Sequence, residues 1–207
     1  FLLLDHMNVI EIILIFEVGT MTSEKENVQS NIRKAYWTKR MNMMYYRYVD
    51  YMVRVLAADS KSMIDVGSSD VGLIENFNWI PKRDALDIAN PYHSENVRGI
   101  KRDLFDYNPK EKYDFATCLQ VLEHIPNAQK FANKLFQIAD RVLISVPYKW
   151  KENSEPEHVH DPVDLKKVND WFGREPDYHI IVEEPLFRSH KNKRLICYYH
   201  FKNEILH

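Results

Sequence analysis

The chain has 207 residues, of which 45% are hydrophobic and 28% are charged, and its formal net charge at pH 7 is −2. This composition predicts one soluble domain, or one domain with a short appendage, and the lack of a basic excess argues against a protein that binds nucleic acid by neutralising phosphates. The two cysteines, Cys118 and Cys197, are too few for a disulfide scaffold or a cysteine-rich zinc module, so they favour a reducing, cytoplasmic setting.

The first segment, residues 1–20, is an apolar run interrupted by carboxylates. It lacks the basic start and the small-residue cleavage site of a signal peptide, and its charges argue against a membrane span. Ser23 and Glu26 form a capping-box pattern just after Met21. Two interpretations stay open: the natural protein begins at Met21 and residues 1–20 are an extension, or these residues form an added strand or helix on the body.

Hydrophobic periodicity in the rest of the chain predicts alternating helices and strands. The first helix carries tyrosines, among them Tyr45, Tyr46 and Tyr51, for which core, lid and dimer surface all stay open. In chain order the expected elements are a helix over 24–58, a strand at 63–66, a helix over 70–79, strands at 85–88, 97–101 and 113–119, a helix over 127–139, a strand at 141–146, a helix over 163–172, and strands at 178–182 and 195–201.

This alternation predicts an α/β fold: a doubly wound, mostly parallel, seven-stranded sheet with helices on both faces. The last two strands are joined by a short basic turn, which predicts an antiparallel strand at one edge. We expect residues 62–207 to form a single core domain and residues 21–61 an N-terminal helical segment. Ligands of such sheets bind beyond the carboxyl ends of the strands, at the switch point, so the chemistry is expected just after the first four strands.

Glycine and acidic residues gather at those positions. Gly67 and Gly72, two of only five glycines in the chain, follow the first strand and predict a tight turn that a ligand can approach closely. Asp87, after the second strand, is placed to accept hydrogen bonds from a ribose diol, and Asp103, after the third, suits an adenine. Each acid alone is more often a helix cap or a solvated loop residue, but acids after successive strands, together with the glycine turn, favour a nucleoside-like ligand.

At this point the sequence resembles the class I S-adenosylmethionine-dependent methyltransferases, over most of residues 62–147. SMIDVGSSDVG is similar to the first motif of that family, ALDI to the second, IKRDLFDY to the next, YDFATCLQVLEHIPN to the fourth and RVLISVP to the fifth. The most specific piece, LQVLEHI, resembles small-molecule enzymes of the ubiquinone-biosynthesis type. The resemblance implies a Rossmann-like methyltransferase fold with S-adenosyl-L-methionine as cofactor. One departure is that Ser69 and Val71 stand where the family has glycines.

The resemblance also implies which residues bind the cofactor. The AYWTKR stretch is similar to a cofactor-covering helix, so residues 21–61 would cover the site, and Arg40 would pair with the methionine carboxylate. Simple core packing is an equally open interpretation for Tyr36. The implied set comprises Asp65, Gly67 and Ser68 for the methionine portion, Asp87 and Ile88 for ribose and adenine, Asp103 and Leu104 for the adenine edge and face, Gln120 for the methionine side, and Tyr36 and Arg40 as a closing pair.

Methyl transfer needs a nucleophile held at near-attack distance, and an oxygen nucleophile usually needs a base. The predicted catalytic candidates are His124, after the fourth strand, and His158 and His160, with Asp161 as a further candidate base. A structural histidine and a solvated loop are the open alternatives. Gln120, Glu123 and His124, with His158 or His160, also resemble the two acids and two histidines of metal-dependent 2′-O-methyltransferases of RNA ends. That function stays a further alternative, but because glutamine is a poor ligand we predict no metal.

The acceptor is predicted from the rim of the site. No large insertion follows the fifth strand, and Tyr148 and Trp150 offer a partly aromatic, polar surface, which favours a small polar molecule, such as a sugar or a surface-polysaccharide precursor. One alternative is a non-catalytic methyltransferase-like partner module, for which the missing glycines argue. A nicotinamide-dependent oxidoreductase is disfavoured because the chain lacks G-x-G-x-x-G.

Overall fold

The computed structural model describes residues 37, 38, 40–185 and 191–201. By its internal contacts the chain divides into two units, residues 1–40 and 41–207. Of the first unit, Trp37, Thr38 and Arg40 are described, and all three are helical. The predictions for residues 1–20 and for Tyr36 fall outside the described residues.

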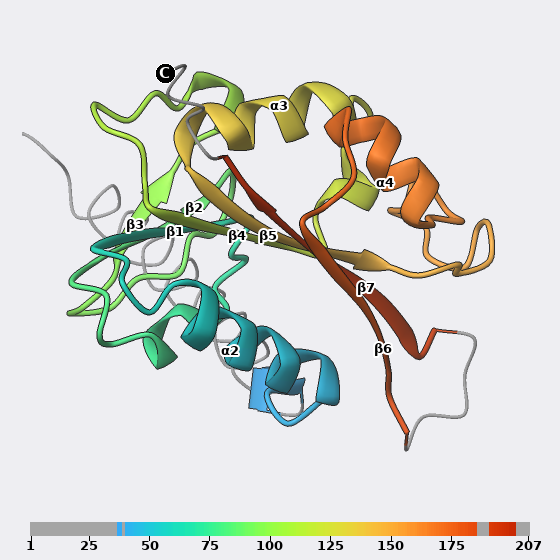
Figure 1. Cartoon of the computed structure of the whole chain (residues 1–207), viewed down its shortest axis with the longest axis horizontal. Coiled ribbons are helices and arrows are strands. Elements are labelled where there is room, and N and C mark those ends of the chain that lie inside the picture. The colour runs from blue at the N-terminus through green and yellow to red at the C-terminus, as the bar shows by residue number, and fades with distance from the viewer. Residues whose placement is uncertain (1–36, 39, 186–190, 202–207) are drawn as a thin grey trace, which may run out of the picture. The chain divides into compact units, whose positions relative to one another are not determined.

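The second unit is built on a seven-stranded sheet with the order β3-β2-β1-β4-β5-β7-β6 (Figure 1). Strands β1 to β5 pair in parallel, whereas β7 runs antiparallel to both β5 and β6. The predicted doubly wound, mostly parallel sheet with an antiparallel edge is therefore confirmed. The strands are β1 (Ser62–Val66), β2 (Lys82–Asp87), β3 (Arg98–Lys101), β4 (Phe115–Leu119), β5 (Arg141–Pro147), β6 (Tyr178–Glu183) and β7 (Lys193–His200).

Helices cover both faces of this sheet. In Figure 1, α2 (Met44–Leu56) lies on one side, and α3 (Ala128–Ile138) and α4 (Leu165–Phe172) lie on the other. Side chains of α3 and α4 pack with β1, β4, β5 and β7 in one hydrophobic core. Local signals set the bounds of α4, because Asp164 accepts a hydrogen bond from the amide of Lys167 at its start and Gly173, with φ 66°, ends it in the left-handed region.

The prediction of one helix over residues 24–58 is wrong within the described part of the chain. Residues 41–43 form a turn, and Met43 is extended, so α2 begins anew at Met44. The cause is a distant residue: the Glu184 carboxylate accepts hydrogen bonds from the backbone amides of Met44, at 3.0 Å, and Tyr45, at 2.9 Å. A carboxylate at a helix N-terminus satisfies free N–H groups and complements the helix dipole.

The prediction of a helix over 70–79 is also largely wrong. Only one 3-10 turn, η1 (Gly72–Asn76), forms there, because Ser69 and Asp70 have positive φ values of 43° and 58° that a right-handed helix does not allow. The link between β2 and β3 has no helix. Among the described residues, no helix is both long and apolar enough to cross a lipid bilayer.

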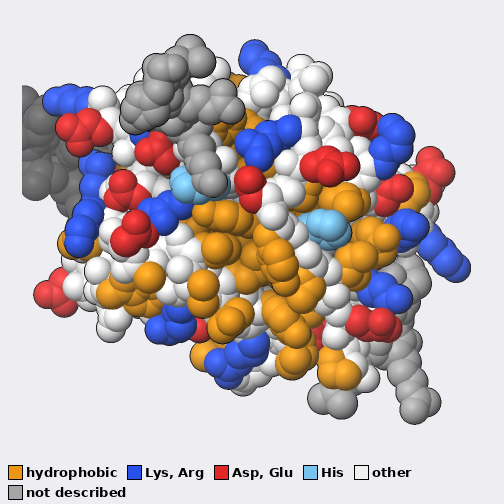
Figure 2. All heavy atoms as spheres, viewed as in Figure 1, with side chains coloured by type: hydrophobic (Ala, Val, Ile, Leu, Met, Phe, Trp, Pro, Cys, Tyr) orange, Lys and Arg blue, Asp and Glu red, His pale blue; other side chains and the backbone are white. Residues whose placement is uncertain are grey.

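α2 also keeps an apolar outer face. Hydrophobic side chains gather across the middle of the surface in Figure 2, and α2 exposes Met44, Tyr51 and Val55. Tyr45 instead lies in the core at 2% exposure. The first helix's tyrosines therefore divide between core and surface.

The sheet has its switch point between β1 and β4. The chain moves outward from β1 through β2 to β3 and then returns to place β4 on the other side of β1. The connections that leave these two strands go to opposite sides, and in open α/β sheets ligands bind beyond the carboxyl ends of the strands at such a point. The residues that follow β1, β2 and β4 meet there.

Candidate active site

Asp65, on β1, places a carboxylate at the switch point. The residue is 5% exposed, and its Oδ1 accepts a hydrogen bond from Thr117 Oγ1 of the neighbouring strand β4 at 2.7 Å. Burial raises the pKa of Asp65 to about 6, the Thr117 hydrogen bond opposes this, and the charge of Asp87 adds to it. The group is therefore largely ionised at neutral pH although it is desolvated, and a bound cation would relieve that cost.

Gly67 makes the turn after β1, and only glycine fits there. Its φ is +77°, and a Cβ atom at this position would lie 2.4 Å from Cγ2 of Val121, in the loop after β4. The Gly67 amide donates to Leu86 O at 2.8 Å, and the buried hydroxyl of Ser68 accepts from the Tyr92 amide at 3.0 Å. These contacts hold the β1 turn against the neighbouring loops on both sides.

Ser69 and Val71, which stand where the resembled family has glycines, have different backbone conformations. Ser69 keeps a left-handed conformation, with φ 43°, and so does Asp70 after it, with φ 58°. Val71, with φ −93°, has an ordinary extended backbone. A Cβ on Gly72 would lie 3.1 Å from the ring of Tyr92, so the close approach occurs one residue later. The loop therefore keeps the tight turn without the usual glycines, at a cost of about 1–2 kcal/mol per left-handed residue.

Asp87, at the end of β2, ties this turn to the next loop. Its Oδ2 accepts from the Ser69 amide at 3.0 Å, and its Oδ1 accepts from the amides of Ala89 and Asn90, both at 2.8 Å. A carboxylate has about four lone-pair sites, so Oδ2 can accept one further donor. Ile88, next to it, is 67% exposed, which leaves an apolar surface beside that free site.

The residues predicted to hold an adenine lie after β3. Asp103 Oδ1 accepts from the Phe105 amide at 2.9 Å and so caps the 3-10 turn η2 (Leu104–Asp106). Leu104 is 3% exposed and belongs to the hydrophobic core. Asp103 is therefore the more accessible of the two predicted residues.

Gln120 follows β4 in a left-handed conformation, with φ 58°. Its Nε2 donates to Ser145 Oγ of β5 at 3.1 Å, and Ser145 Oγ also shares a 2.7 Å hydrogen bond with the hydroxyl of Tyr45 on α2. This chain of hydrogen bonds joins α2, β5 and the end of β4 beneath the site. No local sequence signal connects these three residues.

Glu123 lies in the 3-10 turn η3 (Leu122–His124) and was not among the predicted catalytic residues. It is 1% exposed, and neither of its carboxylate oxygens has a hydrogen-bond partner among the described residues. Burial raises its pKa to about 8; its own backbone amide and the positive charge of Arg194 oppose the shift, and the negative charge of Asp161 adds to it. The signal that could have found it is its place as the acid of the LEHI string.

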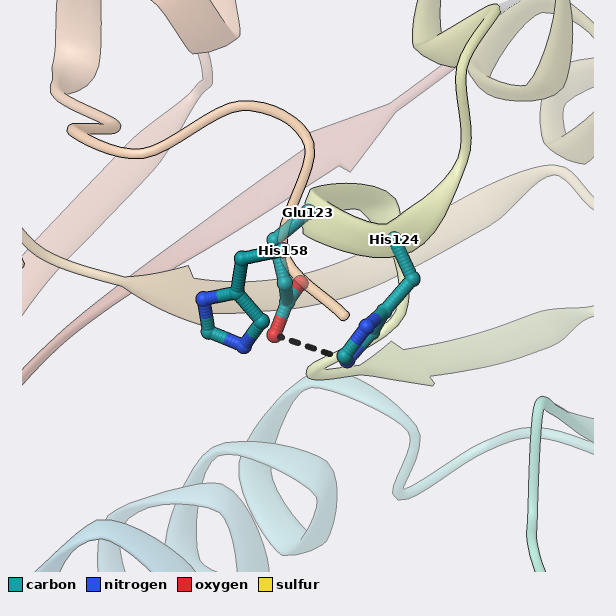
Figure 3. A group of neighbouring side chains, drawn as sticks. All are labelled: Glu123, His124 and His158. Atoms are coloured by element: carbon teal, nitrogen blue, oxygen red, sulfur yellow. Dashed lines mark ion pairs between the residues drawn. The ribbon is translucent and has the colours of Figure 1, made fainter. Parts of the chain in front are cut away.

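His124 and His158 lie beside Glu123 (Figure 3). Their rings meet edge to face with centroids 4.8 Å apart, and His124 Nε2 lies 4.0 Å from Glu123 Oε1. His160 is outside this group: its Nε2 donates to Ile125 O at 2.8 Å, and its ring packs on Trp171. Two of the three predicted catalytic histidines are thus brought together, and the third anchors the loop.

Comparison with solved structures identifies the fold. No family model matches the chain, and no curated protein matches it. Among solved structures, the 1,6-didemethyltoxoflavin-N1-methyltransferase of Burkholderia thailandensis, with bound S-adenosylhomocysteine, has a TM-score of 0.63 at 14% identity, over 88% of this chain and 90% of that one.

Two further structures are similar. The N-methyltransferase NodS of Bradyrhizobium japonicum WM9, in complex with S-adenosylhomocysteine, has a TM-score of 0.61 at 10% identity, over 78% of this chain and 90% of that one. The methyltransferase domain of bacterial CtHen1-C has a TM-score of 0.58 at 14% identity, over 78% and 99%. At such identities the likeness establishes the fold: the chain has the Rossmann-like fold of the methyltransferases.

Proposed function

We propose that the protein binds S-adenosyl-L-methionine at the switch point and transfers its methyl group to a small polar acceptor. The observation that carries this proposal is Asp65, a buried carboxylate that stands at the end of β1 beside a turn that only glycine can make. Such an acid would attract the ammonium group of the methionine portion, and the turn would let the cofactor approach the backbone. The bound S-adenosylhomocysteine of two similar structures supports this assignment.

The remaining cofactor contacts follow from the accessible groups. Asp87 has an acceptor site left for a ribose hydroxyl, and Ile88 offers an apolar surface for the adenine. Asp103 would bond the adenine edge, and Gln120 would line the methionine side. Leu104 lies in the hydrophobic core, so it would hold the loop after β3 in place beneath the adenine. Closure by Tyr36 and Arg40 stays a prediction, as does the ubiquinone-type subfamily.

Methyl transfer requires the protein mainly to hold the acceptor in line with the methyl group of the cofactor. An acceptor oxygen would give an electron pair to the methyl carbon as the carbon–sulfur bond breaks with its pair going to sulfur, so that the sulfonium becomes the neutral thioether of S-adenosylhomocysteine. The acceptor proton must leave to a base. His158 is the best placed, because its Nδ1 donates to Asp161 Oδ2 at 2.6 Å, which leaves Nε2 to accept a proton and stabilises the cation formed.

Buried aromatic and basic side chains pack around His158, since Trp150 and Arg194 are 6% and 5% exposed. Trp150 stacks on the His158 ring, with centroids 5.6 Å apart, and the Arg194 guanidinium lies 4.8 Å from the Trp150 ring. These buried side chains would hold His158 in position. A sugar or surface-polysaccharide precursor stays the proposed acceptor class, on the sequence argument alone.

Calorimetric titration of the purified protein with S-adenosyl-L-methionine, and separately with S-adenosylhomocysteine, tests the cofactor assignment. Micromolar binding of both is expected. If neither binds at millimolar concentration, the assignment fails and the non-catalytic module becomes the better description. Once binding is established, a screen of sugars and nucleotide sugars for production of S-adenosylhomocysteine tests the acceptor class.

Replacing Asp87 with alanine should weaken S-adenosyl-L-methionine binding by about 1.5–3 kcal/mol, because the ribose hydroxyls lose a charged acceptor. The same calorimetric titration measures this change. Asp170→Ala is the matched control, since Asp170 is an exposed acid of α4 that pairs with Lys166 on the surface and should leave the affinity unaltered. An unchanged affinity in Asp87→Ala would remove Asp87 from the site.

A further inference from the structure

A second candidate site lies at an edge of the sheet. β3 is an edge strand (Figure 1), and a cleft of about 1060 Å³ lies beside it and β2, a volume as large as the usual sites of small molecules. None of the described residues assigned to the cofactor lines this cleft. Lys82, which does line it, and Asp87 stand at opposite ends of β2, with their Cα atoms about 16 Å apart.

The cleft is open because no long helix covers this part of the sheet. Residues 102–114, which join β3 to β4, form only the 3-10 turn η2. A longer connection would place a helix over β2 and β3, as is usual in a doubly wound sheet. Instead, residues 94–97 before β3 and residues 109–111 before β4 line the cleft together with the two strands.

A buried carboxylate fixes an arginine in the cleft. Asp84, on β2, is 2% exposed and accepts from Arg98 of β3 twice, from Nε at 3.0 Å and from Nη2 at 2.5 Å. The hydroxyl of Tyr113 also donates to Asp84 and shares a 2.6 Å hydrogen bond with the hydroxyl of Tyr107. A guanidinium has five N–H groups, so three of those of Arg98 remain for a ligand, and its side chain is 63% exposed.

Further cationic side chains gather around this arginine. Lys82 lies 4.7 Å from the centre of the Tyr113 ring, Arg102 follows β3, and Lys110 comes from the loop before β4. Lys82, Arg102 and Lys110 are exposed, and none of them forms an ion pair with a described acid. With Glu95 and Glu111, the lining has five cationic and three acidic side chains, a net charge of +2. Because Asp84 offsets the charge of Arg98, this excess comes from the exposed cations.

Arg83, the fifth cationic residue of the lining, has a donor without an acceptor. It is 8% exposed, and its Nη1 donates to Glu75 O at 3.3 Å. Its Nε is buried and has no hydrogen-bond partner among the described residues. Buried polar groups are nearly always bonded, so an acceptor atom bound in the cleft would satisfy a group that the fold leaves unpaired.

We propose that this cleft binds a small molecule through a phosphate or pyrophosphate group. Arg98, held by Asp84, would offer paired N–H groups to the phosphate oxygens, and the exposed cations would add the attraction. A bounded cleft suits a small molecule better than a nucleic-acid strand, which needs a long basic stripe along its backbone. The site is independent of the proposed methyl transfer, since it shares no described residue with the cofactor site.

Calorimetric titration of the full chain with inorganic pyrophosphate, and separately with inorganic phosphate, tests the site. One pyrophosphate per chain is expected, with an affinity that falls as salt is added. Lys82→Gln, Arg102→Gln and Lys110→Gln should each weaken this binding by about tenfold, because each removes a charged donor. Lys101→Gln is the matched control, since Lys101 is an exposed lysine of β3 that does not line the cleft, and it should leave the affinity unaltered.

A change of the opposite sign sharpens the test. Glu111→Gln should strengthen pyrophosphate binding by about threefold, because it removes a negative charge from the lining. All these variants change exposed side chains, so thermal unfolding should show unchanged melting temperatures. No binding at millimolar pyrophosphate, or binding that the three lining variants leave unchanged, would overturn the proposal. An oligonucleotide that binds more tightly than pyrophosphate and is weakened by the same variants would also overturn it, in favour of a nucleic-acid surface.

Titration in the presence of S-adenosylhomocysteine separates the two sites. Pyrophosphate binding should persist in the complex, and Asp87→Ala should leave it unchanged. Displacement of pyrophosphate by S-adenosylhomocysteine would place the anion at the switch point and contradict the proposal. If the chain binds pyrophosphate with the expected variant effects but does not bind S-adenosylhomocysteine, the proposed function fails and the cleft remains.

Discussion

Asp65→Asn is expected to stabilise the cofactor-free protein at pH 7.5 by about 2–3 kcal/mol while abolishing micromolar binding of S-adenosyl-L-methionine. The pKa of Asp65 is about 6 in the fold and about 3.9 in an unfolded chain, a difference of about 2 units that corresponds to about 3 kcal/mol above pH 6. The fold binds the proton more tightly, so ionising Asp65 destabilises it. Asparagine removes this cost and can still accept the Thr117 hydrogen bond.

Urea denaturation at several pH values measures the stability effect. The component due to Asp65 makes the wild-type protein less stable as the pH rises from about 4 to about 6, so the difference between variant and wild type should grow over that range and then level off. Wild-type affinity for S-adenosyl-L-methionine should fall as the pH drops below 6, because a proton then competes with the ammonium group. A variant that is less stable than wild type at pH 7.5 would contradict this account.

Gly67→Ala should have the second large effect, a loss of about 2–5 kcal/mol of unfolding free energy together with a loss of cofactor binding of about 100-fold or more. Two costs combine: the left-handed φ of +77°, about 1–2 kcal/mol, and the contact of the new Cβ with Val121 at 2.4 Å, about 1–3 kcal/mol. Relief of that contact would move the turn or the loop after β4, and both line the proposed cofactor site.

Two variants separate these costs in denaturant titrations. Gly173 has a similar φ of +66°, but no atom of the described residues lies within 4 Å of the place that a Cβ would take there, so Gly173→Ala should carry only the backbone cost. Gly67→Ala combined with Val121→Ala should recover part of the loss, because the contacting methyl groups are removed. Equal destabilisation by Gly67→Ala and Gly173→Ala would show that the contact with Val121 contributes nothing.

The sheet was predictable because its signals are local. Continuous apolar runs such as RVLISVP are typical of strands buried on both faces, and the structure has β5 at Arg141–Pro147. The bounds of α4 follow from Asp164 and Gly173, which act within a few residues of the helix ends. The start of α2 was not predictable, because Glu184, about 140 residues away in the chain, supplies its cap.

The sequence by itself determined the succession of strands along the chain, the glycine turn at Gly67 and the acids Asp65 and Asp87 at the strand ends, because hydrophobic periodicity and turn geometry depend on neighbouring residues. Only the tertiary structure decided that Glu123 has no hydrogen-bond partner among the described residues, and that His124 and His158 lie beside it while His160 bonds to Ile125 O instead. The physical reason is that burial and hydrogen-bond partners depend on segments that meet only when the sheet has formed.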